Sequence, residues 1–225
     1  MSVCFETVPL LIIIHENTTL MAGLDSLLAR SLGAAIEDNL GEDALHKIDN
    51  RLFEKYGITI NQAILDFQKL DGVLREFFGA GTDGLEKKIF ETVCTLEKSK
   101  TNDQEWMTVE DQFLTRVILE AFGDDDKKEI LTALLEQPRI VSEVLCICNI
   151  PQTSGYRKIN WLIDNGLLTT RGFITTPDGK RVNKYIPVFE NIKINIVKNK
   201  VTVKVQLNKE SMNNSLLIPL IQNYR

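Results

Sequence analysis

The sequence predicts a protein that is mainly α-helical with a small antiparallel β part. Apolar residues recur at helical spacing from residue 24 to about residue 98, which predicts an all-helical first half. Two segments near the C-terminus, 168–188 and 191–207, instead alternate between apolar and polar residues, and each is interrupted by a turn. We therefore expect helices first and two β-hairpins last.

Length and composition are ordinary for a globular protein of one or two domains. The chain has 225 residues, of which 44% are hydrophobic and 25% are charged. Its four cysteines form no paired framework, which favours a reducing compartment, so we expect a cytoplasmic protein. The apolar run 8–14 is too short to span a bilayer, and no secretory signal surrounds it, so we expect no membrane association. Residues 1–20 are interpreted as a misassigned upstream start or a loose arm.

Charge is distributed unevenly along the chain. The formal net charge is -5, which argues against a simple basic nucleic-acid binder. Residues 139–207, however, contain 11 Lys and Arg against 4 Asp and Glu, a balance of 11 - 4 = +7. Residues 25–111 contain 10 against 18, a balance of 10 - 18 = -8. The C-terminal half would attract phosphate and the N-terminal half would repel it.

The N-terminal half predicts an acidic, all-helical domain at residues 22–98. We expect its helices at residues 24–36 (closed by Gly41), 45–53 (closed by Gly57), 58–67, 70–78 and 85–96. The segments RLFEKYGI (51–58) and LREFFGAGTDGLE (74–86) resemble the nitrosopumilus output domain of the fifth type, a helical module of ammonia-oxidising archaea. The resemblance implies a regulatory output role without an assigned chemistry.

The glycine-rich segment GAGTDG at residues 79–84 satisfies the G-x-G-x-x-G pattern of dinucleotide sites. The required context is missing, because a helical segment precedes it where a strand is needed. We interpret it as an interhelical turn, with Thr82 or Asp83 capping the helix that starts at Leu85.

A second domain is predicted at residues 108–208, after a polar linker at 99–107. We expect a helix from Thr108, a second one capped by residues 123–126 and broken by Pro138, a third at 141–148 and a fourth at 152–164, followed by strands. This is the order of a winged helix-turn-helix. The segments VILEAFGDDDKKEI (117–130), GYRKI (155–159) and NGLL (165–168) resemble ArsR-like winged-helix regulators of archaea.

The helix at 152–164 has the character of a recognition helix. Thr153 or Ser154 can cap its first turn, Gly155 allows close approach of another helix, and Gly166 ends it. Its outer face carries side chains that read base edges or bind phosphate. The expected DNA contacts from this helix are Gln152, Thr153, Ser154, Tyr156, Arg157, Lys158 and Asn160.

The strands that follow predict a wing and an extra hairpin. Strands at 168–176 and 182–188 flank a turn with Lys180 and Arg181, which match the place where the wing of the ArsR-like family touches DNA; the alternative is a solvated hairpin tip. The second hairpin, 191–207, has an apolar face that must be covered by a partner subunit or by the chain's own helices. The apolar tail 216–221 can dock there, while its polar flanks favour partial disorder.

We find no constellation of residues for catalysis and expect neither an enzyme nor a cofactor. Cys146 and Cys148 resemble the Cys-x-Cys helix of arsenic-responsive ArsR members, which bind a soft ion through thiolates. Pro151 stands where a third cysteine commonly sits, and residues two apart on a helix do not share a face. We therefore expect buried apolar cysteines and no metal site.

The sequence thus predicts a DNA-binding transcriptional regulator whose partners are double-stranded DNA and a second copy of itself. A homodimer is expected because one recognition helix reads too few base pairs for useful specificity. The alternative is a protein-interaction adaptor whose winged helix binds a component of the transcription machinery. The two can be separated by salt, because binding to duplex DNA should fall steeply as salt rises, while binding by an adaptor should show little such dependence.

Overall fold

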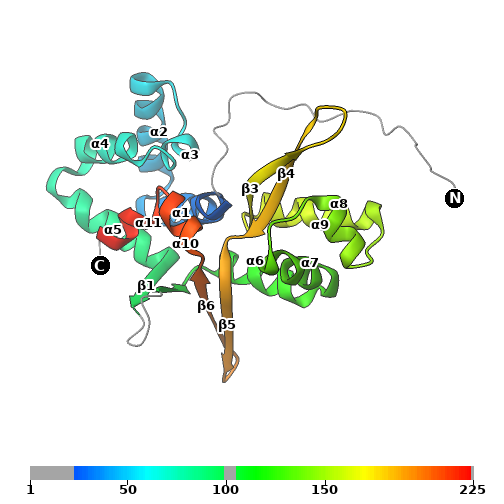
Figure 1. Ribbon diagram of the computed structural model, residues 1–225. Helices are drawn as coiled ribbons and strands as arrows, with labels where there is room; N and C mark the ends of the chain where they lie inside the picture. Colours follow the sequence, from blue (N-terminus) through cyan, green and yellow to red (C-terminus); the bar gives the residue numbers. More distant parts are fainter. Residues whose placement is uncertain (1–22, 99–104, 224–225) are drawn as a thin grey trace, which may run out of the picture.

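The computed structural model describes residues 23–98 and 105–223 (Figure 1). The predicted arm at 1–20, most of the predicted linker and the last two residues lie outside these ranges. The N-terminal helices are α1 (Gly23–Leu40), α2 (Glu42–Tyr56), α3 (Ile60–Ala63), α4 (Phe67–Phe78), the 3-10 turn η1 (Gly79–Gly81) and α5 (Thr82–Val93). Then follow β1 (Cys94–Lys98), β2 (Glu105–Val109), α6 (Gln112–Gly123), α7 (Asp125–Glu136), α8 (Val141–Ile147) and α9 (Gln152–Asp164). The chain ends with β3 (Leu168–Thr175), β4 (Arg181–Pro187), β5 (Phe189–Val197), β6 (Lys200–Leu207), α10 (Lys209–Asn214) and α11 (Ile218–Asn223).

The predicted fold class is confirmed: the structure is mainly helical with a small antiparallel β part. Helices α6 to α9 followed by the β3–β4 hairpin have the predicted winged helix-turn-helix order of elements, and β5–β6 is the extra hairpin. Figure 1 shows the two hairpins projecting in opposite directions, β3–β4 upward and β5–β6 downward. The tips of the two hairpins therefore lie on opposite sides of the molecule.

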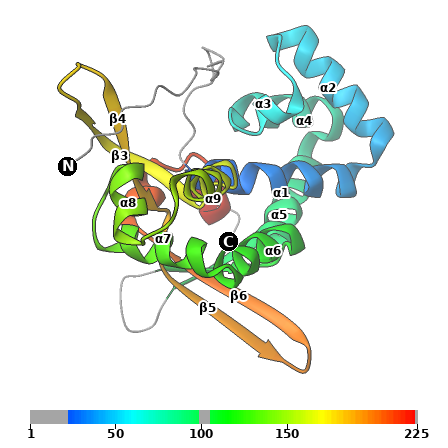
Figure 2. The same ribbon diagram turned by 90° about the vertical axis from the view of Figure 1, so that its right-hand side faces the viewer.

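Helix α1 connects the N-terminal helices to the winged-helix elements. Its leucine and isoleucine side chains repeat at helical spacing and are buried, so one stripe of the helix faces the core. It contacts α2 and α5 of the N-terminal helices, and also α6 and β3 (Figure 2). The buried apolar side chains form one continuous cluster that runs from Leu24 to Ile221. The predicted domain division at residues 98 and 108 is not tested by this packing and stays a prediction.

The four-stranded sheet is the largest difference from the prediction. Its order is β1-β2-β6-β5, and all its neighbouring strands are antiparallel. The end of the helix expected at 85–96 and residues 105–107 of the expected linker lie in strands instead, β1 and β2. The reason is a long-range pairing: Met107 lies opposite Val205 and Val109 opposite Val203, and all four side chains are buried on one face. The β5–β6 pair completes that face.

Helix ends also differ from the predictions. The helix expected at 58–67 is only the single turn α3, and the Thr59 N–H that precedes it donates to the Gln62 side-chain oxygen at 2.9 Å, which fixes its start. Helix α5 begins at Thr82 and not at Leu85, and no side chain caps it. Helix α6 begins at Gln112 and not at Thr108, since Asp111 accepts the Leu114 N–H at 2.8 Å and thereby fixes the first turn.

The C-terminal tail docks on α1 and not on the extra hairpin. The buried Asp25 carboxylate accepts hydrogen bonds from the Ser215 hydroxyl and from the Leu216 N–H at 2.8 Å. Leu217, Ile218 and Ile221 are buried behind this contact. The predicted partial disorder is thus replaced, for residues 209–223, by two short helices.

In the parts of the chain that the structure describes, no helix has the length and apolar character needed to cross a membrane.

Candidate nucleic-acid interface

Helix α9 has the bounds that the sequence predicted for a recognition helix, Gln152–Asp164. Ile159 and Leu162 are buried on its inner face. A Cβ built on Gly155 would lie 2.3 Å from a methyl carbon of Leu145 on α8, so a larger residue at this position would require the Leu145 side chain to move. The predicted side-chain cap is wrong: Ser154 is half-buried and its hydroxyl donates to the Pro151 carbonyl oxygen at 3.1 Å. The helix is held by packing rather than by a cap.

The outer face of α9 carries an exposed row of predicted contact residues: Gln152, Thr153, Tyr156, Arg157 and Asn160. The Tyr156 side chain is 46% exposed although it is largely apolar. Residues 153, 156, 157 and 160 stand three or four positions apart and so share one side of the helix. Amide, hydroxyl and guanidinium groups in such a row suit base edges and phosphate oxygens.

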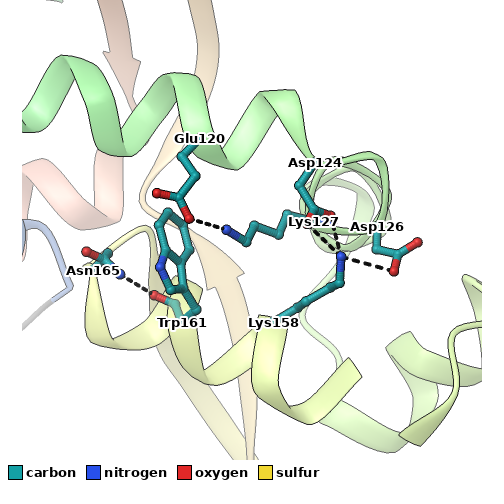
Figure 3. A network of polar contacts seen from close by, with 7 residues as sticks. All are labelled: Glu120, Asp124, Asp126, Lys127, Lys158, Trp161 and Asn165. Atoms are coloured by element: carbon teal, nitrogen blue, oxygen red, sulfur yellow. Dashed lines mark hydrogen bonds and ion pairs between the residues drawn. The ribbon is translucent and has the colours of Figure 1, made fainter. Parts of the chain in front are cut away.

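Lys158 lies on the flank of the helix and points into the protein. Its ammonium contacts both carboxylate oxygens of Asp124 at 2.6 Å and lies 3.2 Å from Asp126 (Figure 3). Its side chain is 17% exposed. The predicted contact of Lys158 with DNA stays a prediction; in the structure its charge is engaged in fastening α9 to the start of α7.

A second contact fastens the same two helices. The buried Lys127 ammonium lies 3.4 Å from the centroid of the Trp161 ring and 2.8 Å from a Glu120 oxygen (Figure 3). An ammonium over an indole face is attracted by the negative face of the ring, and the attraction grows when water is excluded. Sequence reasoning missed this pair, because nothing in a single sequence joins Lys127 to a tryptophan on another helix.

The electrostatics of the Asp124 site give a pH dependence. The hydrogen bond from Lys158 lowers the pKa of Asp124, with further lowering by the Lys127 N–H that this residue caps at 3.0 Å. The same contact raises the pKa of Lys158. A carboxyl whose pKa is lower in the folded than in the unfolded state stabilises the fold above its unfolded pKa, and that stabilisation is lost as the pH falls through the folded pKa.

Asp124→Asn is therefore expected to lower the free energy of unfolding by about 1 kcal/mol near neutral pH, because it removes the charge but keeps the capping oxygen. Urea unfolding should show that the difference from the wild type shrinks below about pH 4. Asp125→Asn is the matched control, since Asp125 is an exposed neighbour, and it should change little at any pH. If the difference in the free energy of unfolding between Asp124→Asn and the wild type stayed the same in acid, the lowered pKa of Asp124 would be contradicted.

The end of α9 is locked against α1. Gly166 has φ +70°, and a Cβ on it would lie 2.3 Å from the Gly23 carbonyl oxygen and 2.7 Å from the Leu27 nitrogen. The Leu167 N–H bonds to the Leu162 oxygen at 2.9 Å and closes the helix. The predicted glycine stop is confirmed, and its close contact with α1 ties α9 to the N-terminal helices.

The wing is the β3–β4 hairpin. Its turn is closed by the Thr176 N–H bonded to the Lys180 oxygen at 2.9 Å, and Gly179 supplies φ +83°. Lys180 and Arg181 are exposed at this tip. The Lys180 ammonium lies 3.2 Å from Asp178 with its side chain 81% exposed, and the Arg181 guanidinium lies 4.6 Å over the Phe173 ring. An exposed ion pair and an exposed cation–π contact are both weak, so both cations can exchange their partners for phosphate.

The remaining candidate sites do not gain support from the geometry. Only residues 79–81 form the predicted turn between helices, because residues 82–84 already belong to α5; Asp83 does not cap α5 and instead accepts from Arg75 at 2.6 Å. Cys146 is exposed and Cys148 half-buried, against the prediction that both are buried. Burial, with Glu129 and Asp126 nearby, raises the pKa of Cys148 and disfavours the thiolate that binds metals. Among the described residues no group of three or more His, Cys, Asp or Glu side chains could hold a metal ion.

Comparison of the chain with models of known protein families, with curated proteins and with solved structures finds no match. The two family resemblances read from the sequence thus stay predictions.

Proposed function

We propose that this protein is a DNA-binding transcriptional regulator that reads duplex DNA with the outer face of α9 and holds the DNA backbone with the β3–β4 wing. The observation that carries the proposal is the exposed row on α9, which includes Gln152, Arg157 and Asn160, on a helix whose inner face is buried. Amides and guanidinium groups are the side chains that form paired hydrogen bonds with adenine and guanine edges in the major groove.

Charge supports the same proposal. Residues 139–207 carry a formal balance of 11 - 4 = +7, although the whole chain is at -5. Lys180 and Arg181 at the wing tip are exposed, whereas Lys158 is paired inside the protein. We assign phosphate contacts to Lys180 and Arg181, a contact with phosphate or guanine to Arg157, and the positioning of the helix to Lys158.

The wider proposal follows the sequence resemblance: a cytoplasmic, ArsR-like regulator of archaeal type that acts as a homodimer without a cofactor and is not an enzyme. In the described part of the chain Cys94, Cys146 and Cys148 are free thiols, which fits a reducing compartment. Two copies would read two half-sites and so reach a useful specificity.

The second candidate is an adaptor that binds a protein of the transcription machinery through the same surface. It is favoured by two aromatic side chains, Tyr156 at 46% and Phe173 at 51% exposure, because aromatic residues are enriched in protein interfaces. The affinity of an adaptor for its protein partner should change little with salt concentration, whereas the affinity for duplex DNA should fall steeply as salt rises.

Selection from a random-sequence duplex library with the full chain tests the proposal directly. The regulator enriches a sequence motif after several rounds, and that motif is lost when the library is offered to Arg157→Ala. If the wild type enriches no motif, the DNA-reading function is rejected and the adaptor is favoured.

The wing makes its own prediction. The double variant Lys180→Ala/Arg181→Ala is expected to weaken binding about equally for enriched and for random duplexes, since phosphate contacts carry no sequence information. The slope of log affinity against log salt should become less steep by about 2. Anisotropy titrations at several salt concentrations measure both effects. A variant that binds like the wild type would show that the wing tip is a solvated turn.

A further inference from the structure

Strand β5 is an open edge of the four-stranded sheet. The sheet order β1-β2-β6-β5 puts it last, and in the described part of the chain its backbone pairs with β6 alone. Every side chain from Lys193 to Val197 is exposed. Figures 1 and 2 show the β5–β6 hairpin projecting away from the helices. The outer edge of β5 can thus accept another strand.

The apolar face of the hairpin continues the core into solvent. Ile192, Ile194 and Ile196 lie opposite Val205, Val203 and Val201 on one face. Val203 and Val205 are buried, but Ile194 is 39% and Ile196 64% exposed. Apolar side chains on an exposed strand edge are a surface that proteins either protect or use for pairing.

The turn fixes which backbone groups face outward. Lys198 and Asn199 form the two-residue turn with φ 46° and 66°, so Val197 and Lys200 are the pair that exchanges hydrogen bonds next to the loop. Hydrogen-bonded pairs alternate along an antiparallel ladder. The N–H and C=O groups of Ile192, Ile194 and Ile196 therefore point away from β6, to the open edge.

We propose that β5 pairs antiparallel with β5 of a second copy of this chain, about a two-fold axis at Ile194. Ile194 then lies opposite Ile194 of the partner copy, and the outward N–H and C=O groups of the two residues hydrogen-bond to each other. Ile192 lies opposite Ile196 of the partner copy. The two apolar faces become one surface across an eight-stranded sheet.

Side-chain matching selects this register. With the axis at Ile194, Ile192 lies opposite Ile196 of the partner copy, and Lys193 lies opposite the neutral Asn195, so no like charges face each other. A shift of the axis to Ile192 would bring Ile194 to the bulge at Glu190, and a shift to Ile196 would bring it to the turn residue Lys198. Only the central register aligns all three isoleucines with isoleucines of the partner copy.

The edge carries little of the usual protection against pairing. Lysine and proline are the residues that commonly guard an edge strand. No proline lies within β5, and the ammonium of Lys193 lies 4.0 Å from the centroid of the Trp106 ring, on the polar face of its own sheet. This inference rests on the homodimer of the proposed function, whose interface it assigns, but the pairing itself does not require DNA.

Sedimentation equilibrium of the full chain without DNA tests the pairing. The wild type should sediment as a dimer, and Ile194→Lys, which puts two ammonium groups on the axis, should raise the dissociation constant on the order of 100-fold. Leu135→Lys adds the same charge at another apolar residue, 46% exposed on α7, and should remain a dimer. Circular dichroism confirms that each variant is folded.

A charge placed at Asn195 makes the register itself testable. Asn195→Lys should weaken the dimer about tenfold by placing an ammonium opposite Lys193 of the partner copy, whereas Asn195→Glu places a carboxylate there and should not weaken it. The proposal is overturned if the wild type is a monomer at every concentration, if Ile194→Lys dimerises like the wild type, or if the two Asn195 variants dimerise equally well.

Discussion

Replacing Gly166 by alanine is expected to lower the free energy of unfolding by about 3 kcal/mol, the sum of positive-φ strain and a steric overlap. The residue has φ +70°, and a Cβ would lie 2.3 Å from the Gly23 carbonyl oxygen. That oxygen belongs to backbone, so it cannot rotate away as a side chain would. Relief requires α1 to move away from the end of α9.

Gly172→Ala separates the cost of positive-φ strain from the cost of steric overlap. Gly172 has φ +75°, but a Cβ there meets nothing within 4 Å. Its cost should be about 1 kcal/mol, from backbone strain alone. Urea unfolding of both variants measures the difference. Equal costs for the two glycines would show that α1 does not press on the end of the recognition helix.

Replacing Arg157 by alanine is expected to weaken binding to the enriched duplex about 10- to 100-fold, or about 1–3 kcal/mol. Arg157 is exposed on α9 between Tyr156 and the inward-pointing Lys158, so it is the main cation that the helix offers to DNA. The loss should be larger for the enriched duplex than for random duplexes if Arg157 contacts a base, and equal if it contacts phosphate.

Arg116→Ala is the matched control for this prediction. Arg116 is an exposed arginine on α6, so its removal changes the net charge by the same amount at a distant place. Its affinity for DNA should stay close to that of the wild type, and thermal unfolding should show both variants folded. Equal weakening by the two variants would mean that net charge, and not the α9 face, determines binding.

The local part of the fold could be predicted from the sequence because its signals are local. The stripe of Ile159 and Leu162, the turn at Pro151 and the glycine at 166 together gave α9 its observed bounds. The hairpins followed from alternation and turn residues. Most of the outward side chains of α9 were also predicted, since the periodicity that buries one face exposes the other.

The long-range part could not be predicted, because a single sequence contains no pairing information. Strands β1 and β2 are five residues each, and they are strands because β6, nearly a hundred residues later, pairs with β2. The inward direction of Lys158 depends on Asp124 of α7, which the sequence marked only as a helix cap. The tail needs Asp25, close to the other end of the described chain.

Helix α9 is physically connected to the rest of the molecule. Lys158 and Lys127 fix the side of α9, and Gly166 fixes its end against α1. The Asp25 carboxylate on α1 also holds the C-terminal tail. A ligand or partner that moved the N-terminal helices would thus displace α9 through α1.

The most direct measurement is the salt dependence of duplex binding by the full chain. If Arg157, Lys180 and Arg181 contact phosphates, log affinity should fall against log salt with a slope of about -3 for each bound copy. Anisotropy with the enriched duplex across a range of salt concentrations gives that slope. An affinity that does not change with salt, or no binding to duplex DNA at low salt, would contradict the claim that α9 and the wing form a DNA-binding surface.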